Sequence, residues 1–219
     1  MGNCINLLAN YPKSKRDIKK RLADKTEEDR VIARKFDKEF FDGDRKHGYG
    51  GFNYNPIYWE DVIPDIVRYY NLKKNSKILD IGCAKGFMLY DFKRLYPDMS
   101  YEGIDISSYA IENSIESIKP FLKVANATKL PFSDNYFDLT ISINTLHNLE
   151  GNDLDLAFKE LNRVTKINSF ITVDAFENEQ ERELMLAWNL TAKTILSVKD
   201  WQSYFKKVRY NGDYYWFKP

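Results

Sequence analysis

The fold is decided by residues 77–87, which read KILDIGCAKGF. The apolar run at 77–81 predicts a buried strand, and the small residues after it predict a tight turn that opens a helix. Gly82 permits backbone torsions that other residues resist, while Ala84 and Gly86 let a ligand lie against the main chain. The N-terminus of the following helix supplies free backbone N–H groups. This stretch therefore predicts a ligand-binding turn between a strand and a helix.

Strands and helices alternate along the chain after this turn. The sequence pattern predicts strands at 77–81, 101–104, 122–125, 137–143 and 170–176, and helices at 86–95, from 107 and at 152–164. This alternation predicts a doubly wound, mostly parallel α/β sheet of the Rossmann-like type. Two strand-like pieces at 194–198 and 210–217, with a helix near 200–207 between them, predict an antiparallel edge. In such sheets ligands bind where the strands end, so we expect the site just after Ile81, Ile104, Ala125 and Ile143.

The residues before this sheet predict an N-terminal helical extension. Residues 14–41 are charged and helical in period, and 43–55 form a loop rich in glycine and tyrosine. A second helix is expected from Pro56 to Tyr70, with a kink at Pro64.

Composition fits a single α/β domain with a short extension. The 219 residues carry 33 basic and 32 acidic side chains, so no global field indicates a nucleic-acid binder. Residues 13–35 are locally basic, with ten basic and five acidic side chains, which suits either a solvated helix face or a phosphate-bearing partner. Two cysteines without metal-ligand spacing favour a reducing, cytoplasmic location. No apolar run reaches the ~20 residues that span a bilayer, so no membrane partner is expected.

Acidic residues near the turn indicate which ligand it binds. A dinucleotide fingerprint needs glycines at 82, 84 and 87, and the chain has Ala84 and Phe87 instead. The carboxylate of Asp80 would repel a pyrophosphate and favour a ligand that carries an ammonium group. Asp105 ends the second predicted strand, where an acidic residue can accept both ribose hydroxyls; its alternative role is a helix N-cap.

The turn at 82–86 and the segments on either side of it together resemble the class I S-adenosylmethionine (SAM)-dependent methyltransferase family. The resemblance extends from residue 77 to about 176. The motifs that carry the resemblance are LDIGCAKG at 79–86, GIDIS at 103–107, ANA at 125–127 with LPF at 130–132, FDL at 137–139, and ELNRV at 160–164. Two residues depart from the family pattern: Ala84 replaces the usual central glycine and Asn126 replaces the usual aspartate.

The resemblance implies a SAM-binding methyltransferase domain at 56–219, preceded at 1–55 by the helical extension and an aromatic, glycine-rich lid. It implies that SAM, and the product S-adenosyl-L-homocysteine, bind to one set of residues. These are Asp80, Gly82, Cys83, Ala84, Gly86, Asp105, Ile106, Asn126, Ala127, Ile143 and Asn144. No Asp, Glu and His cluster suggests a catalytic metal.

The acceptor site is expected around residues 143–149, INTLHNL, because this loop usually faces the transferred methyl group in the family. His147 lies where a general base would be useful, or it hydrogen-bonds the adjoining loop or packs against SAM. In the lid, Arg45 can hold an anionic substrate, and Tyr49 and Tyr54 can contact SAM or the acceptor. The alternative for this segment is a packed loop that covers one end of the sheet.

These expectations favour a methyltransferase that acts on a small-molecule acceptor, with deprotonation of a hydroxyl or amine. The alternatives are a methyltransferase for RNA or protein, supported by the basic residues 13–35, and a SAM-binding module without transfer activity. The acceptor, the atom that is methylated and the oligomeric state stay open.

Overall fold

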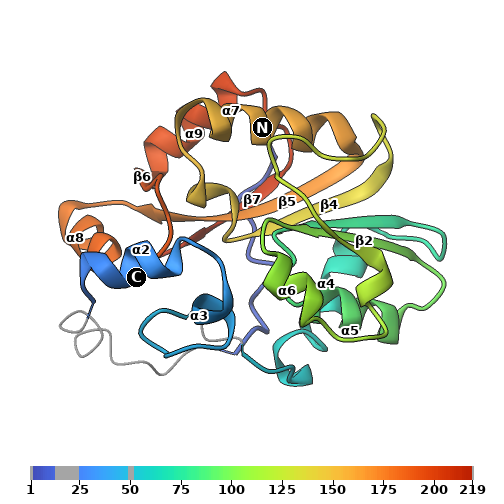
Figure 1. Cartoon of the computed structure of the whole chain (residues 1–219). Coiled ribbons are helices and arrows are strands. Elements are labelled where there is room, and N and C mark those ends of the chain that lie inside the picture. Colours follow the sequence, from blue (N-terminus) through green and yellow to red (C-terminus); the bar gives the residue numbers. More distant parts are fainter. Residues whose placement is uncertain (1, 13–24, 49–51, 219) are drawn as a thin grey trace.

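The computed structural model describes residues 2–12, 25–48 and 52–218. A single sheet with helices on both faces forms its centre (Figure 1). The strand order is β3-β2-β1-β4-β5-β6, and β7 also pairs with β5. The strands are β1 Lys77–Ile81, β2 Ser100–Asp105, β3 Leu122–Val124, β4 Phe137–Ile143, β5 Thr165–Phe176, β6 Leu196–Ser197 and β7 Asp213–Phe217. The order confirms the doubly wound, mostly parallel α/β sheet that the sequence predicts.

Each face of the sheet buries an apolar cluster under its own helices. On one face, α7 (Gly151–Val164) and α9 (Val198–Lys207) pack aromatic side chains such as Phe158, Trp201 and Phe205 into one cluster. On the other face, α4 (Val62–Tyr69) and α5 (Phe87–Leu95) contribute Ile63 and Phe92 to a second cluster. The short α6 (Ser108–Glu112) follows β2. Burial on both faces explains why the central strands read as nearly continuous apolar runs.

The prediction of an antiparallel edge is wrong. Ala175 of β5 pairs with Leu196 of β6, and residues 170–174 of β5 pair with β7, both in parallel register. The reason is the intervening helix α9, which carries the chain back to the starting end of the sheet before β7 begins. An alternating pattern shows that a piece is a strand, but it does not encode the strand's direction.

The expected helices of the first seventy residues are shorter than predicted. Residues 13–24 lie outside the described residues, and the remainder of 14–41 forms two pieces, α2 (Glu27–Ala33) and α3 (Lys38–Phe41). Phe36, between them, has a φ of 51°, which interrupts a helix. Thr26 and Asp29 close a capping box at the start of α2.

Pro64 does not kink a long helix, contrary to expectation. The chain instead forms a single 3₁₀ turn at Pro56–Tyr58 and then starts α4 at Val62. Pro64 therefore lies in the first turn of α4, where the N–H that proline lacks has no partner within the helix.

The start of the chain belongs to the edge of the sheet. The N–H of Ile5 donates to the carbonyl of Tyr214 at 2.9 Å, and the N–H of Tyr214 donates to the carbonyl of Asn3 at 3.0 Å. Leu7 is buried in the same cluster as Ile63. The N-terminal residues thus share a core with the main body, and the boundary predicted at 55/56 stays a prediction. Among the described residues, no helix is long and apolar enough to span a membrane.

Candidate active site

A cavity of about 1750 Å³ opens at the carboxyl ends of β1, β2, β4 and β5. This is the end of the sheet at which parallel topologies bind ligands. Most of the residues that the sequence assigns to a site line it. They are Arg45, Asp80, Gly82, Cys83, Ala84, Asp105, Ile106, Asn126, Ala127, Ile143, Asn144 and His147.

The turn after β1 depends on unusual backbone torsions. Gly82, Ala84 and Gly86 have φ angles of 85°, 50° and 76°. A Cβ atom on Gly82 would lie 2.1 Å from the hydroxyl oxygen of Thr145, so the loop after β4 packs directly against this glycine. Gly86 is not among the residues that line the cavity, and its predicted contact with the cofactor stays a prediction. A Cβ there would meet Leu122 at 2.8 Å, so its absence allows α5 to pack closely on β3.

Asp105 joins the ends of β1 and β2. Its Oδ2 accepts a 2.8 Å hydrogen bond from the N–H of Ala84, and its Oδ1 accepts a 2.9 Å bond from the N–H of Ser107. Burial raises the pKa of the Asp105 carboxyl group, and the backbone N–H donors oppose that rise. The helix N-cap is Ser107, whose Oγ accepts from the N–H of Ala110 at 3.1 Å. Asp105 therefore braces the glycine turn and keeps lone pairs for a ligand in the cavity.

Asp80 is a buried carboxylate without a protein partner. Its side chain lines the cavity, the residue is 4% exposed, and no hydrogen bond or ion pair reaches it from the part of the chain that the structure describes. Burial, and then the negative charge of Asp105, raise the pKa of Asp80 to about 8. A cationic group placed beside Asp80 would relieve both effects.

A third part of the cavity combines apolar surface with an amide. Ile106 lines the cavity and is 53% exposed, which is unusual for a large apolar residue next to a buried acid. The exposed Asn126 uses its Oδ1 to accept from the N–H of Thr128 at 3.0 Å, and its amide N–H groups stay available. The segment that follows is held by α7, because Arg163 donates to the carbonyl of Leu130 at 3.0 Å. Flat apolar groups with a polar edge fit such a surface.

The loop after β4 contains His147, which is 4% exposed and fixed by β5. The backbone N–H of Asp174 donates to its Nδ1 at 2.9 Å. Asn144 has a φ of 51°, and its N–H reaches the carbonyl of Thr172 at 3.1 Å. Asp174 itself lines the cavity and is 6% exposed; burial raises the pKa of its carboxyl group, and His147 lowers it. Sequence reasoning missed Asp174, because it is one polar residue inside a run that reads as buried strand.

The predicted lid is only partly at the cavity. Arg45 lines it, and Tyr49 lies outside the described residues. The structure places Tyr54 elsewhere: its hydroxyl donates to Asp91 at 2.6 Å, and its ring packs edge-on against Tyr90 of α5. Pairing with a buried carboxylate removes Tyr54 from the cavity lining.

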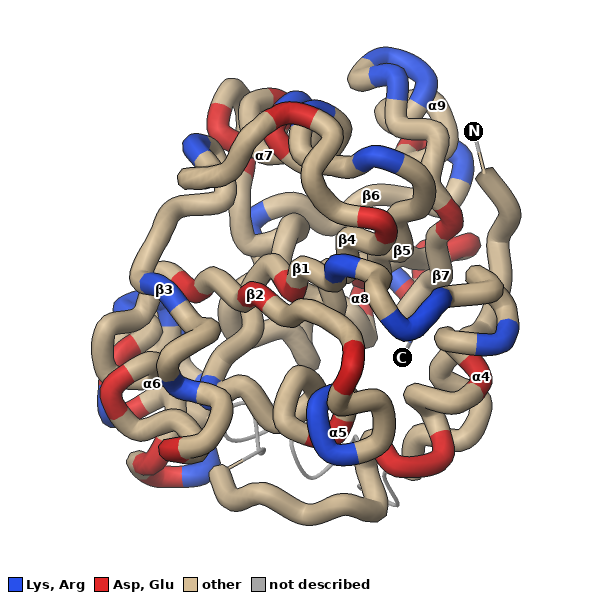
Figure 2. Tube along the Cα trace, turned by 90° about the vertical axis from the view of Figure 1, so that its right-hand side faces the viewer, with Lys and Arg blue, Asp and Glu red and all other residues tan. Residues whose placement is uncertain are grey.

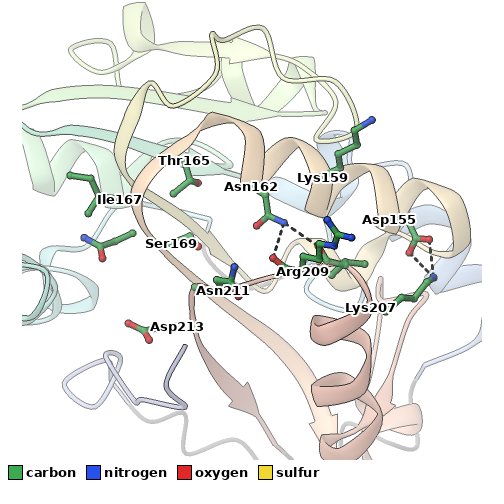
Figure 3. Close-up of a pocket in the computed structure, with 13 residues that line it drawn as sticks. Asp155, Lys159, Asn162, Thr165, Ile167, Ser169, Lys207, Arg209, Asn211 and Asp213 are labelled. Atoms are coloured by element: carbon green, nitrogen blue, oxygen red, sulfur yellow. Dashed lines mark hydrogen bonds and ion pairs between the residues drawn. The ribbon is translucent and has the colours of Figure 1, made fainter. Parts of the chain in front are cut away.

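A second, smaller cleft lies at the other end of the sheet (Figure 3). It holds about 690 Å³ beside the start of β5 and β7, and it contains none of the predicted site residues. Asp155 and Lys207 on its wall form an ion pair at 2.9 Å. In the described residues, no group of three or more His, Cys, Asp or Glu side chains is placed to hold a metal ion. The larger cavity is therefore the candidate site.

Comparisons with known proteins agree with this geometry. The family described as "Methyltransferase domain" matches residues 79–173. The malonyl-[acyl-carrier protein] O-methyltransferase of Legionella pneumophila is 31% identical over 117 residues, which cover 52% of this chain and 40% of the relative. The tRNA (carboxymethyluridine(34)-5-O)-methyltransferase of Arabidopsis thaliana is 35% identical over 134 residues, which cover 60% of this chain and 31% of the relative.

The fold also matches solved structures. A chain of the solved "Complex between the Haloferax volcanii Trm112 methyltransferase activator and the putative methyltransferase" superposes with a TM-score of 0.56 at 14% identity. The match covers 90% of this chain and 77% of the other. At this identity the likeness concerns the fold alone.

Proposed function

We propose that this protein is a class I SAM-dependent enzyme that transfers a methyl group from SAM to a small-molecule acceptor, a proposal supported by the match of residues 79–173 to the family described as "Methyltransferase domain". The observation that carries the proposal is the pair of buried acids, Asp80 and Asp105, at neighbouring strand ends of one cavity. Asp80 has no protein partner and suits the ammonium of a methionine moiety. Asp105 retains acceptor capacity for ribose hydroxyls.

The rest of the cavity lining also fits this cofactor. The exposed face of Ile106, with Ala127 and the amide of Asn126, suits an adenine ring and its polar edge. Gly82 and Ala84 leave the main chain open for close approach, and Ile143 and Asn144 extend the site beneath the loop after β4. When bound, SAM supplies an activated methyl group, because its sulfonium leaves as a neutral thioether. The protein must then hold the acceptor in line and remove a proton where the acceptor carries one.

A small acceptor is supported by the size of the cavity and by the distribution of charged residues on one face of the molecule. The cavity continues past the proposed cofactor residues to Arg45, Asn148 and Lys193, which leaves room for a second ligand. On the face drawn in Figure 2, the basic and acidic residues of the described part of the chain are interspersed and form no continuous basic stripe; residues 13–24 of the basic segment lie outside the described residues. A small molecule buried in the cavity needs no such stripe.

Transfer of label from SAM tests the proposal. Methyl-labelled SAM is incubated with the purified protein and separate pools of metabolites, RNA and protein, and calorimetry measures SAM binding in parallel. We expect SAM to bind and label to appear in the metabolite pool. Bound SAM without label in any pool would favour a non-catalytic SAM-binding module.

RNA is the second candidate acceptor, and a specific finding favours it. One relative, 35% identical over 134 residues, is a tRNA methyltransferase. Within the basic segment 13–35, the described residues Arg34 and Lys35 line the cavity. Label in the RNA pool, with binding that weakens steeply as salt rises, would replace the small-molecule proposal by this one.

A further inference from the structure

The hydrogen bond at His147 determines which ring nitrogen carries the proton. Nδ1 accepts the backbone N–H of Asp174 at 2.9 Å, so Nδ1 has no proton of its own. A neutral imidazole with an unprotonated Nδ1 carries its proton on Nε2 and donates from that atom. Nε2 therefore has no lone pair available to remove a proton from an acceptor. The backbone carbonyl of His147 accepts from the N–H groups of Lys193 and Thr194, which holds this arrangement in place.

In contrast to the Nε2 atom of His147, the carboxylate of Asp174 has lone pairs that can accept a proton. It lines the cavity, and the residue is 6% exposed. No hydrogen bond reaches the carboxylate from the described residues, and its Oδ1 lies 3.7 Å from the Nδ1 of His147. A buried carboxylate with free lone pairs accepts protons readily. Burial also raises the pKa of the Asp174 carboxyl group, which strengthens it as a base.

The sheet register places Asp174 beside the predicted acceptor loop. Ile143 pairs with Thr172, so Asp174 lies two positions beyond the end of β4, next to the loop that carries His147. Two other charged residues of the cavity lining have ionic partners of their own: Glu177 pairs with Lys218 at 2.7 Å, and Lys193 pairs with Glu150 at 3.3 Å. Asp174 is thus a carboxylate at the acceptor end that has no cationic side chain as a partner among the described residues.

We propose that Asp174 takes the proton of the acceptor and that His147 positions the acceptor by donating a hydrogen bond from Nε2. This inference rests on the proposed function. In the step, the O–H or N–H bond of the acceptor breaks and its proton moves to an Asp174 oxygen. The electron pair on the acceptor atom forms a bond to the methyl carbon, and the carbon–sulfur bond breaks with its pair going to sulfur. Charge and atoms balance without a further reactant.

The tautomer of His147 tests the inference on the free protein, without cofactor. The chain contains two histidines, His47 and His147, so ¹⁵N NMR of the two rings can be assigned with the variants His47→Gln and His147→Gln. We expect the neutral His147 ring to carry its proton on Nε2. In ¹³C NMR, the carboxyl signal that disappears in Asp174→Asn should titrate above the usual range of aspartate, ~3.9. A ring protonated on Nδ1, or a titration at or below the usual range, would overturn the inference.

The rate of methyl transfer tests it with the complete system. The label assay described above is run from acidic to alkaline pH with the wild type, Asp174→Asn and Asp174→Glu. We expect Asp174→Asn to lower the rate by about 10²–10⁴-fold, with the affinity for SAM unchanged within about twofold. The acidic limb of the pH–rate profile should disappear in Asp174→Asn and return, shifted, in Asp174→Glu. The control is Asp155→Asn, a carboxylate of the second cleft, which should keep both rate and profile.

The outcomes separate the inference from the proposed function. If the wild type transfers label and Asp174→Asn transfers it equally well, Asp174 is not the proton acceptor and the proposed function stands. If the wild type transfers no label, the proposed function fails. The NMR measurements need neither SAM nor acceptor, and they then decide whether Asp174 has a raised pKa and whether the neutral His147 ring carries its proton on Nε2.

Discussion

The carboxylate of Asp105 accepts a 2.8 Å hydrogen bond from the backbone N–H of Ala84. The end of β2 therefore fixes the conformation of the turn after β1, although 21 residues separate the two positions. A ligand that binds to Asp105 therefore lies next to a turn whose conformation Asp105 stabilises. Ligand binding and the structure of the turn are coupled at this residue.

Loss of the Asp105 carboxylate should weaken SAM binding. We expect Asp105→Ala to cost about 1.5–3 kcal/mol of binding free energy, the range for hydrogen bonds to a charged group, as measured by calorimetry. The matched control is Asp138→Ala, because Asp138 also accepts a backbone N–H, from Lys77 at 2.9 Å, but at the opposite end of β1. The control should lower stability and leave SAM affinity unchanged. An equal affinity for SAM in Asp105→Ala and in the wild type would contradict the assignment of Asp105 to the ribose hydroxyls.

SAM binding should release a proton near neutral pH through Asp80. In the free protein burial raises its pKa to about 8, so at a lower pH the carboxyl group is mostly protonated. A bound ammonium favours the ionised form, and affinity should rise as the pH approaches about 8 and then level off. Calorimetry in buffers with different ionisation enthalpies detects the released proton. Asp80→Asn should abolish the buffer dependence, and a wild type without buffer dependence would contradict the assignment of Asp80.

Gly82 in the turn should tolerate substitution far less than Gly151, another glycine with a positive φ. Gly82→Ala places a Cβ 2.1 Å from Thr145, whereas Gly151, also at positive φ, has no atom within 4 Å of such a Cβ. Gly151→Ala should cost only the strain of the left-handed conformation, roughly 1–2 kcal/mol. Gly82→Ala should lower the free energy of unfolding, measured in urea, by clearly more than Gly151→Ala. Equal losses of this free energy in the two variants would mean that the loop after β4 moves away from residue 82 at little cost.

Tyr54 should contribute to stability and not to ligand binding. Tyr54→Phe removes a 2.6 Å hydrogen bond to Asp91, whose other oxygen is buried without a partner among the described residues. We expect a loss of about 1–3 kcal/mol in the free energy of unfolding, because Asp91 loses a donor while buried. SAM affinity should stay within about twofold of the wild type. A large change in that affinity would return Tyr54 to the predicted lid.

The sequence predicts the sheet well because strands that are buried on both faces leave apolar runs, and the turn at 82–86 is marked by small residues. Asp80 and Asp105 could be singled out because Asp80 comes two residues before Gly82 of that turn and Asp105 ends the next strand, where such sheets bind ligands. Their roles toward SAM stay predictions.

Other features depend on contacts between residues far apart in the sequence. The direction of β7 follows from the crossover of α9, and Gly86 is needed for packing against Leu122. Tyr54 is held by Asp91, 37 residues away. Asp174 was missed because its neighbours on β5 are apolar, and only the folded sheet shows that its side chain faces the cavity.

The pairing of residues 3–5 with Tyr214 bears on how the protein behaves in solution. Exposed strand edges are templates on which other chains add, and here the opening residues occupy part of the outer side of β7. Shortening the chain at its N-terminus would leave those backbone groups open to a neighbouring molecule. Light scattering of such a variant should therefore reveal self-association.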